Sequence, residues 1–111
     1  MEFSMPEPSA PVSLSNKVAG CLLGGALGDA LGGRSERGGG PLTLSDDTQL
    51  TMATCESILR CAAVRPPDIA DTFARWYSER RLTGLGSSTL KAMRDLSAGV
   101  HWALAGARGK Y

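Results

Sequence analysis

The sequence predicts an all-α fold. Apolar residues recur at helical spacing, as in the i, i+4, i+7 stripe of Ile69, Phe73 and Trp76. Capping residues and prolines precede such runs, glycine-rich segments separate them, and no stretch alternates as a β-strand does. The chain has 111 residues, of which 42% are hydrophobic, so it has the size of one domain at most and enough apolar residues for a core.

The first expected element is a glycine-rich helix behind a polar tail. Residues 1–14 are rich in Pro, Ser and Glu, and we expect them to form a disordered tail. Ser15 or Asn16 then caps a helix that reaches about Leu31. Glycine costs about 1 kcal/mol per helical site relative to alanine, so a regular ridge of glycines predicts that another backbone approaches closely. The ridge consists of Gly20, Gly24, Gly28 and Gly32.

Four further helices are expected after this one, so that residues 15–111 form one helical region. Glycines and Pro41 predict a loop over residues 32–44. The later helices are expected over residues 45–64, 66–80 and 89–96, with a short fifth one over 100–107.

Charge and cysteine usage exclude several classes of protein. Twelve basic and eleven acidic residues give a net charge of +1, which argues against a nucleic-acid partner. The uncharged run 18–28 is too short for the roughly 20 residues that span a membrane, so we expect no membrane association and a cytoplasmic location. Cys21, Cys55 and Cys61 include no C-x-x-C pair and are expected to be buried free thiols.

Asp29 lies in the middle of the apolar stripe of the first predicted helix, in the same direction as Val18. A carboxylate there needs a partner, because burying it unpaired is costly. A metal site, an arginine, or the backbone N–H groups of a neighbouring helix end could each serve. Structural hydrogen bonding is the ordinary role of such a group.

Ser45-Asp46-Asp47-Thr48 opens the second predicted helix. Its carboxylates and hydroxyls are the hard oxygen ligands that Mg²⁺ prefers. The same residues also suit a helix N-cap, with Asp46 and Gln49 at capping-box spacing. One helix start cannot complete an octahedral site, so a metal would need further acidic ligands.

Two loop segments could also carry chemistry. Glu36 lies alone between Arg34 and Arg37, either as a solvated surface acid or as a general acid/base in a mobile lid. The segment 84–89 (Gly-Leu-Gly-Ser-Ser-Thr) precedes a helix. It is either a plain turn or a place where backbone N–H groups hold phosphate.

Three segments occur together in order: Gly24–Gly32 (GGALGDALG), Ser45–Thr51 (SDDTQLT) and Gly84–Thr89 (GLGSST). This combination resembles the N-terminal portion of the ADP-ribosylglycohydrolase family, including the dinitrogenase-reductase-activating glycohydrolases. The resemblance covers roughly residues 16–111. It implies an all-α orthogonal helical bundle around two Mg²⁺ ions. Its expected substrate is ADP-ribose joined by a glycosidic bond to a protein side chain or a related acceptor.

The resemblance also implies a role for each candidate residue. Ser45, Asp46 and Asp47 correspond to the N-terminal half of the metal site, with Asp46 and Asp47 also counted as catalytic. Glu36 corresponds to a loop glutamate implicated in catalysis or gating, although its arginine-rich flanks depart from the usual pattern. Asp29 corresponds to a structural acid behind the metals. The expected substrate-binding residues are Gly84, Gly86, Ser87 and Ser88.

Two marks of the family are missing from the sequence: a Gly-Asn-Gly loop and the Asp-x-Asp-Thr segment that supplies further metal ligands. We therefore expect the chain to be about the first third of such an enzyme, to bind Mg²⁺ weakly and not to turn over without the remaining portion. The alternatives are a non-catalytic homologue that binds ADP-ribose or a protein, and a small helical domain whose Asp-Asp-Thr is only a cap.

Overall fold

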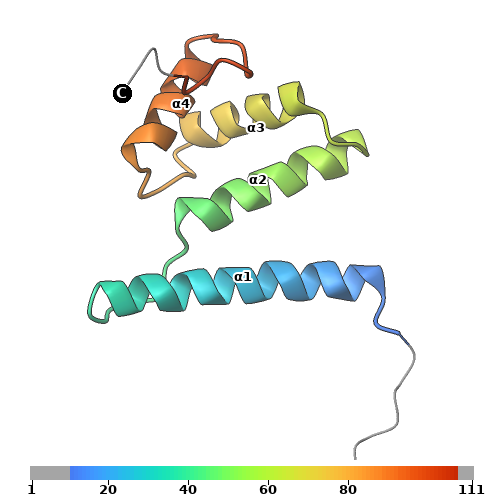
Figure 1. The fold of residues 1–111 in the computed structure, drawn as a ribbon, viewed down its shortest axis with the longest axis vertical. Helices are drawn as coiled ribbons and strands as arrows, with labels where there is room; N and C mark the ends of the chain where they lie inside the picture. Colours follow the sequence, from blue (N-terminus) through green and yellow to red (C-terminus); the bar gives the residue numbers. More distant parts are fainter. Residues whose placement is uncertain (1–10, 108–111) are drawn as a thin grey trace, which may run out of the picture.

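The computed structural model describes residues 11–107, which contain four helices and no strand (Figure 1). The all-α prediction is confirmed. The predicted disordered tail falls mainly on residues 1–10, which lie outside the described residues, while Leu14 already belongs to a helix. The helices are α1 (Leu14–Glu36), α2 (Asp46–Cys61), α3 (Pro66–Ser78) and α4 (Ser87–Ser97).

Helix α1 differs from its predicted bounds at both ends. Its N-cap is Ser13, whose side chain accepts a hydrogen bond from the Asn16 N–H, so the predicted caps Ser15 and Asn16 are wrong. The helix also continues through the paired glycines at 32 and 33 and ends five residues later than predicted, at Glu36. It stops where Gly38 takes the left-handed region with φ +77°, which favours glycine over other residues.

The predicted fifth helix is wrong. Residues 101–106 form turns instead, in which His101 C=O accepts hydrogen bonds from the N–H groups of Leu104 and Ala105. Left-handed glycines at 99 (φ +89°) and 106 (φ +76°) limit the segment to these turns. Asp95 Oδ2 accepts from the Gly106 N–H at 2.9 Å, which ties the segment back to α4.

The core lies among α2, α3 and α4 and the 79–86 connection. Its buried members are Ala53, Trp76, Leu82 and Met93. A polar seam runs beside it, in which Ser57 and Thr72 are fully buried and Arg60 bridges the helices by donating to Asp68 and Thr72. Helices α2 and α3 are therefore held by both apolar packing and hydrogen bonds.

Among the described helices, α1 packs only against α2 (Figure 1), and several of its leucines are exposed. Leu23 is 71% exposed and Leu27 is 55% exposed. The radius of gyration is 18.5 Å, against about 13 Å for a compact domain of this length. No described atom lies within 4 Å of a β-carbon placed on the ridge glycines, so the predicted backbone approach is not made by residues 11–107.

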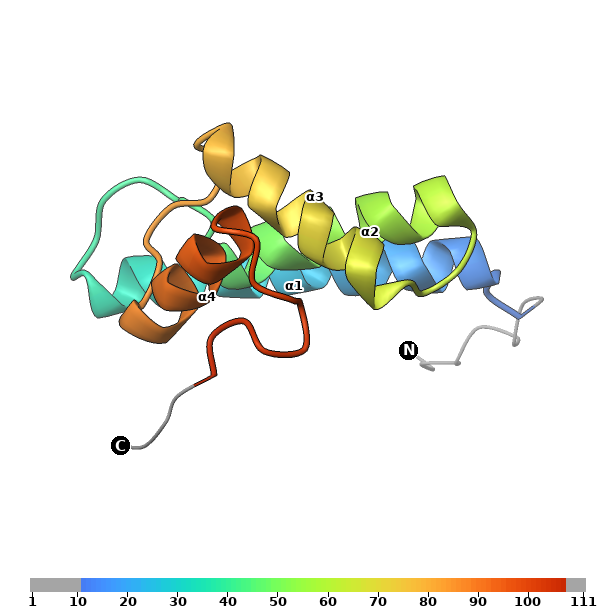
Figure 2. The same ribbon diagram turned by 90° about the horizontal axis from the view of Figure 1, so that it is seen from above.

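Seen from above in Figure 2, α3 lies over α2 and α1 lies beneath α2. In Figure 1, α2 approaches α1 at the N-terminal end of α2 and diverges toward its C-terminal end. The place where α1 and α2 meet is therefore the Asp-Asp-Thr segment, and the candidate site is built there.

Candidate functional site

Asp29 of α1 joins the first turn of α2. Its Oδ2 atom accepts one hydrogen bond from the Ser45 N–H and another from the Thr48 hydroxyl, both at 2.7 Å. The prediction that Asp29 has a partner is confirmed, and the partners include a backbone N–H at a neighbouring helix end. These bonds, that from Thr48 first, lower the pKa of the Asp29 carboxyl. Asp29 is therefore a charged acceptor at neutral pH and fixes how α2 begins.

The N-terminus of α2 presents two acidic side chains with no bonded partner. Ser45 is the N-cap, and its hydroxyl accepts from the Asp47 N–H at 3.2 Å. The interpretation of this segment as a helix N-cap is confirmed, with Ser45 as the cap, but the capping box of Asp46 and Gln49 does not form, because Gln49 bonds elsewhere. Asp46 and Asp47 occupy the first turn, where the helix dipole favours negative charge. Within residues 11–107 neither carboxylate accepts a hydrogen bond or forms an ion pair, so their oxygens remain available to a ligand.

Glu36 is the last residue of α1 rather than a loop residue, so its predicted position in a flexible loop is wrong. Its side chain is exposed. The loop proper starts at Arg37, whose Nη2 atom donates to the Pro41 carbonyl at 2.9 Å. No hydrogen bond or ion pair in the described part of the chain joins Glu36 to Asp46 or Asp47.

The segment with Gly84, Gly86, Ser87 and Ser88 is exposed and leads into α4. Gly84 has φ +65°, which a residue with a β-carbon adopts only with strain. Gly86 is the N-cap of α4, and no side chain caps the helix. The first N–H groups of α4 are thus free of side-chain acceptors, as an anion-binding helix start requires.

A second pair of hydrogen bonds joins this segment to α2. Gln49 Oε1 accepts from the Thr83 N–H at 2.8 Å, and Gln49 Nε2 donates to Thr83 Oγ1 at 2.7 Å. Sequence reasoning missed both residues, because Gln49 was interpreted as part of a cap. Asp29 thus connects the first two sequence segments, and Gln49 connects the second segment to Thr83, the residue that precedes the third.

A groove of about 620 Å³ lies between α1 and α2. Its polar wall includes Asp29, Asp47 and Thr48, and its apolar wall comes mostly from α1. The remaining lining residues are Cys21, Leu22, Leu23, Gly25, Ala26, Thr51 and Met52. Cys21 is exposed and Cys55 and Cys61 are half-buried, so the prediction of buried cysteines is wrong, although all three are free thiols.

The acidic residues provide only part of a metal site. In residues 11–107 no cluster of three or more His, Cys, Asp or Glu side chains is placed to hold a metal ion. Asp29, the acid nearest to the pair along the hydrogen-bond network, already accepts two bonds on one oxygen. Asp46 and Asp47 with the Ser45 hydroxyl are thus the oxygen donors that this region offers.

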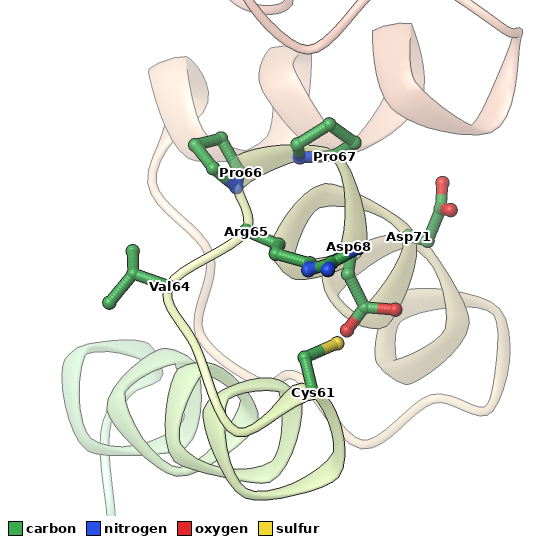
Figure 3. Close-up of a pocket in the computed structure, with 7 residues that line it drawn as sticks. All are labelled: Cys61, Val64, Arg65, Pro66, Pro67, Asp68 and Asp71. Atoms are coloured by element: carbon green, nitrogen blue, oxygen red, sulfur yellow. The ribbon is translucent and has the colours of Figure 1, made fainter.

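A cavity of about 480 Å³ lies at the opposite end of α2, about 22 Å along the helix from Asp46 (Figure 3). The Cys61 thiol points toward Asp68 there. Asp68 also accepts from Ser57 and Arg60, both at 2.5 Å. Burial and the neighbouring Asp68 raise the pKa of the Cys61 thiol, so it is protonated at neutral pH and is a poor nucleophile. The polar groups at this cavity therefore serve to join α2 and α3 rather than to carry out chemistry.

Comparison with known proteins assigns the chain to a family. The model of the ADP-ribosylglycohydrolase family matches residues 10–110. The chain belongs to this family. The match covers α1 to α4, and with them both sets of hydrogen bonds that join the three sequence segments.

The chain is similar to two curated proteins, of which the second carries a name that agrees with this assignment. An uncharacterized protein of Archaeoglobus fulgidus is 32% identical over 84% of the chain and 38% of its own length. The ADP-ribosylhydrolase ARH3 of Danio rerio is 30% identical over 80% of the chain and 30% of its own length. The chain therefore spans less than two-fifths of either relative. No solved structure matches it significantly.

No helix in residues 11–107 is both long enough and apolar enough to cross a membrane. The cytoplasmic location and the lack of a nucleic-acid partner remain predictions from the sequence.

Proposed function

We propose that the chain is the N-terminal portion of a Mg²⁺-dependent hydrolase that cleaves the glycosidic bond between ADP-ribose and a modified side chain or related acceptor. The observation that carries the proposal is that Asp29 joins the first two segments and Gln49 joins the second to Thr83, directly before the third, in a chain that belongs to the ADP-ribosylglycohydrolase family. ADP-ribosylated protein or ADP-ribose is the expected partner.

The donors at the start of α2 fit Mg²⁺ in kind. Mg²⁺ takes oxygen ligands and commonly uses one or two carboxylates together with substrate oxygens. Asp46 and Asp47 offer carboxylates without competing partners, and Ser45 offers a hydroxyl. When bound, the metal supplies positive charge that polarises substrate oxygens. Two ions need more ligands than these three residues, so this portion holds half of the site.

The other residues bind and orient the substrate. The uncapped start of α4, with Gly84, Gly86, Ser87 and Ser88, suits the diphosphate of ADP-ribose, because free N–H groups and the helix dipole attract anions. Glu36, at the end of α1, is proposed to exchange a proton with the reacting groups or to gate the site. The exposed apolar side of α1 agrees with a larger folded unit around it, and we infer that the described portion alone does not turn over.

A second candidate function is binding without catalysis. The absence of a three-acid cluster in residues 11–107 favours it for this portion of the chain. In that case, the chain holds ADP-ribose or an ADP-ribosylated partner through α4 and the groove but hydrolyses nothing.

Calorimetric titration tests the proposal. The 111-residue chain is titrated with MgCl₂ and then with ADP-ribose, and release of ADP-ribose from a modified protein is measured in parallel. We expect weak Mg²⁺ binding that Asp46→Ala and Asp47→Ala abolish and no release of ADP-ribose. Asp71→Ala is the matched control, because this exposed aspartate lies on α3 away from the start of α2. Mg²⁺ heats unchanged in Asp46→Ala and Asp47→Ala would refute the metal assignment.

A further inference from the structure

The side chain of Gln49 recognises one residue of the segment before α4. Its carbonyl oxygen accepts from the Thr83 N–H at 2.8 Å, and its amide nitrogen donates to the Thr83 hydroxyl at 2.7 Å. The backbone N–H can only donate, so it defines which end of the amide is oxygen. The same nitrogen also faces the Leu44 carbonyl at 3.5 Å.

This paired contact selects one register of the segment. Thr83 offers a backbone donor and a hydroxyl acceptor together, whereas the next residue, Gly84, has no side chain to complete the pair. A one-residue shift would therefore lose the contact to Gln49 Nε2. Within residues 11–107 no other side-chain hydrogen bond joins residues 83–86 to α2.

Apolar packing holds the segment at Leu82 and Leu85 but not at the two residues between them. Leu82 is buried in the core and Leu85 is packed against it, which anchors the segment. Between them, Thr83 and Gly84 are exposed, and glycine has wide backbone freedom. The hydrogen bonds to Gln49 are the directional contacts that fix how the backbone runs from Leu82 toward Gly86.

We infer that Gln49 is a positioning residue for ligand binding. It holds the 83–86 segment, and so the first N–H groups of α4, at a fixed place relative to Asp46 and Asp47. Gln49 lies in the same helical turn as this acidic pair. The inference rests on the proposed function, because the ligand it concerns is ADP-ribose, with its diphosphate at α4 and its ribose near the acidic pair.

Variants of both partners test this role in the full 111-residue chain. Hydrogen exchange of the Thr83 amide measures the tether, and calorimetry measures affinity for ADP-ribose in MgCl₂ and for MgCl₂ alone. Gln49→Ala removes both hydrogen bonds. We therefore expect about tenfold faster exchange of the Thr83 amide and about tenfold weaker binding of ADP-ribose. Thr83→Val removes one bond, and a change of about threefold is expected. Thr83→Ser keeps both bonds and should match the wild type.

Affinity for MgCl₂ alone separates positioning from folding. We expect Gln49→Ala to leave it unchanged, because the acidic pair and Asp29 are untouched. Equal weakening of MgCl₂ and ADP-ribose binding, together with loss of helicity, would mean that Gln49 only stabilises the fold and would overturn the inference. Unchanged ADP-ribose affinity in Gln49→Ala would overturn it too and leave the proposed function standing. If the wild-type chain does not bind ADP-ribose, the proposed function fails and the inference with it.

Discussion

Met93→Ala tests whether the core among α2, α3 and α4 carries the stability of the chain. Met93 is 3% exposed and belongs to the cluster with Ala53, Trp76 and Leu82. Met52→Ala is a matched control, because Met52 also lies within a helix but is 49% exposed. Both changes replace methionine by alanine in a helix, so any difference in helix propensity is shared.

The expected magnitudes follow from the burial of the two side chains. Replacing a buried methionine by alanine costs about 2–5 kcal/mol, from lost apolar transfer and from the cavity left behind. The Met93 cluster is small and near the surface, so partial collapse places the cost at the lower end, about 2–3 kcal/mol. Met52 leaves no cavity, and its replacement should cost about 0.5 kcal/mol or less.

Urea unfolding, followed by tryptophan fluorescence and by circular dichroism, measures both variants. Trp76 lies in the same cluster and reports on its packing. With a slope of about 1–1.5 kcal/mol per molar urea, Met93→Ala should lower the midpoint by about 2 M and Met52→Ala by less than about 0.5 M. Equal midpoints for the two variants, or a larger effect of Met52→Ala, would contradict the location of the core.

Three further changes test local features. The pKa of Asp29 is lowered, so its bond to Ser45 stabilises the fold above about pH 4, and this stabilisation is lost as the pH falls through the folded-state pKa. Exchange of the Ser45 amide should therefore become faster in acid, and Asp29→Asn should abolish this pH dependence. Gly84→Ala should cost about 1 kcal/mol, because φ is +65°, and an unchanged urea midpoint would contradict the strain. Gly24→Ala should stabilise α1 by about 0.5–1 kcal/mol, because the added β-carbon meets open space; lower helicity by circular dichroism would contradict this.

The helices were predictable because their signals are local. Pro66 and Pro67 begin α3 as expected, and Phe73 and Trp76 of the predicted stripe pack in the core. The ends of the helices were less predictable than their positions. Gly32 and Gly33 look like a helix stop, yet α1 continues to Glu36 and ends only before the left-handed Gly38.

Part of the candidate site was predictable from the sequence. The cost of burying a carboxylate implied a partner for Asp29, but three kinds of partner satisfied that requirement. The choice among them needed the position of α2. The pairing of Gln49 with Thr83 spans 34 residues, and no local pattern encodes a contact between such distant residues. Its two partners are ordinary polar residues, so only the fold brings out their role.

The order in which the helices contact each other has a consequence for synthesis. Each helix pairs with its neighbour in sequence, α1 with α2, α2 with α3 and α3 with α4. Such local contacts form quickly, so α2 to α4 can assemble as soon as they have left the ribosome. Helix α1 emerges before these helices and keeps exposed leucines even after α2 has docked. The nascent chain therefore exposes apolar side chains of α1 before and after α2 to α4 assemble, and this surface favours aggregation until another segment covers it.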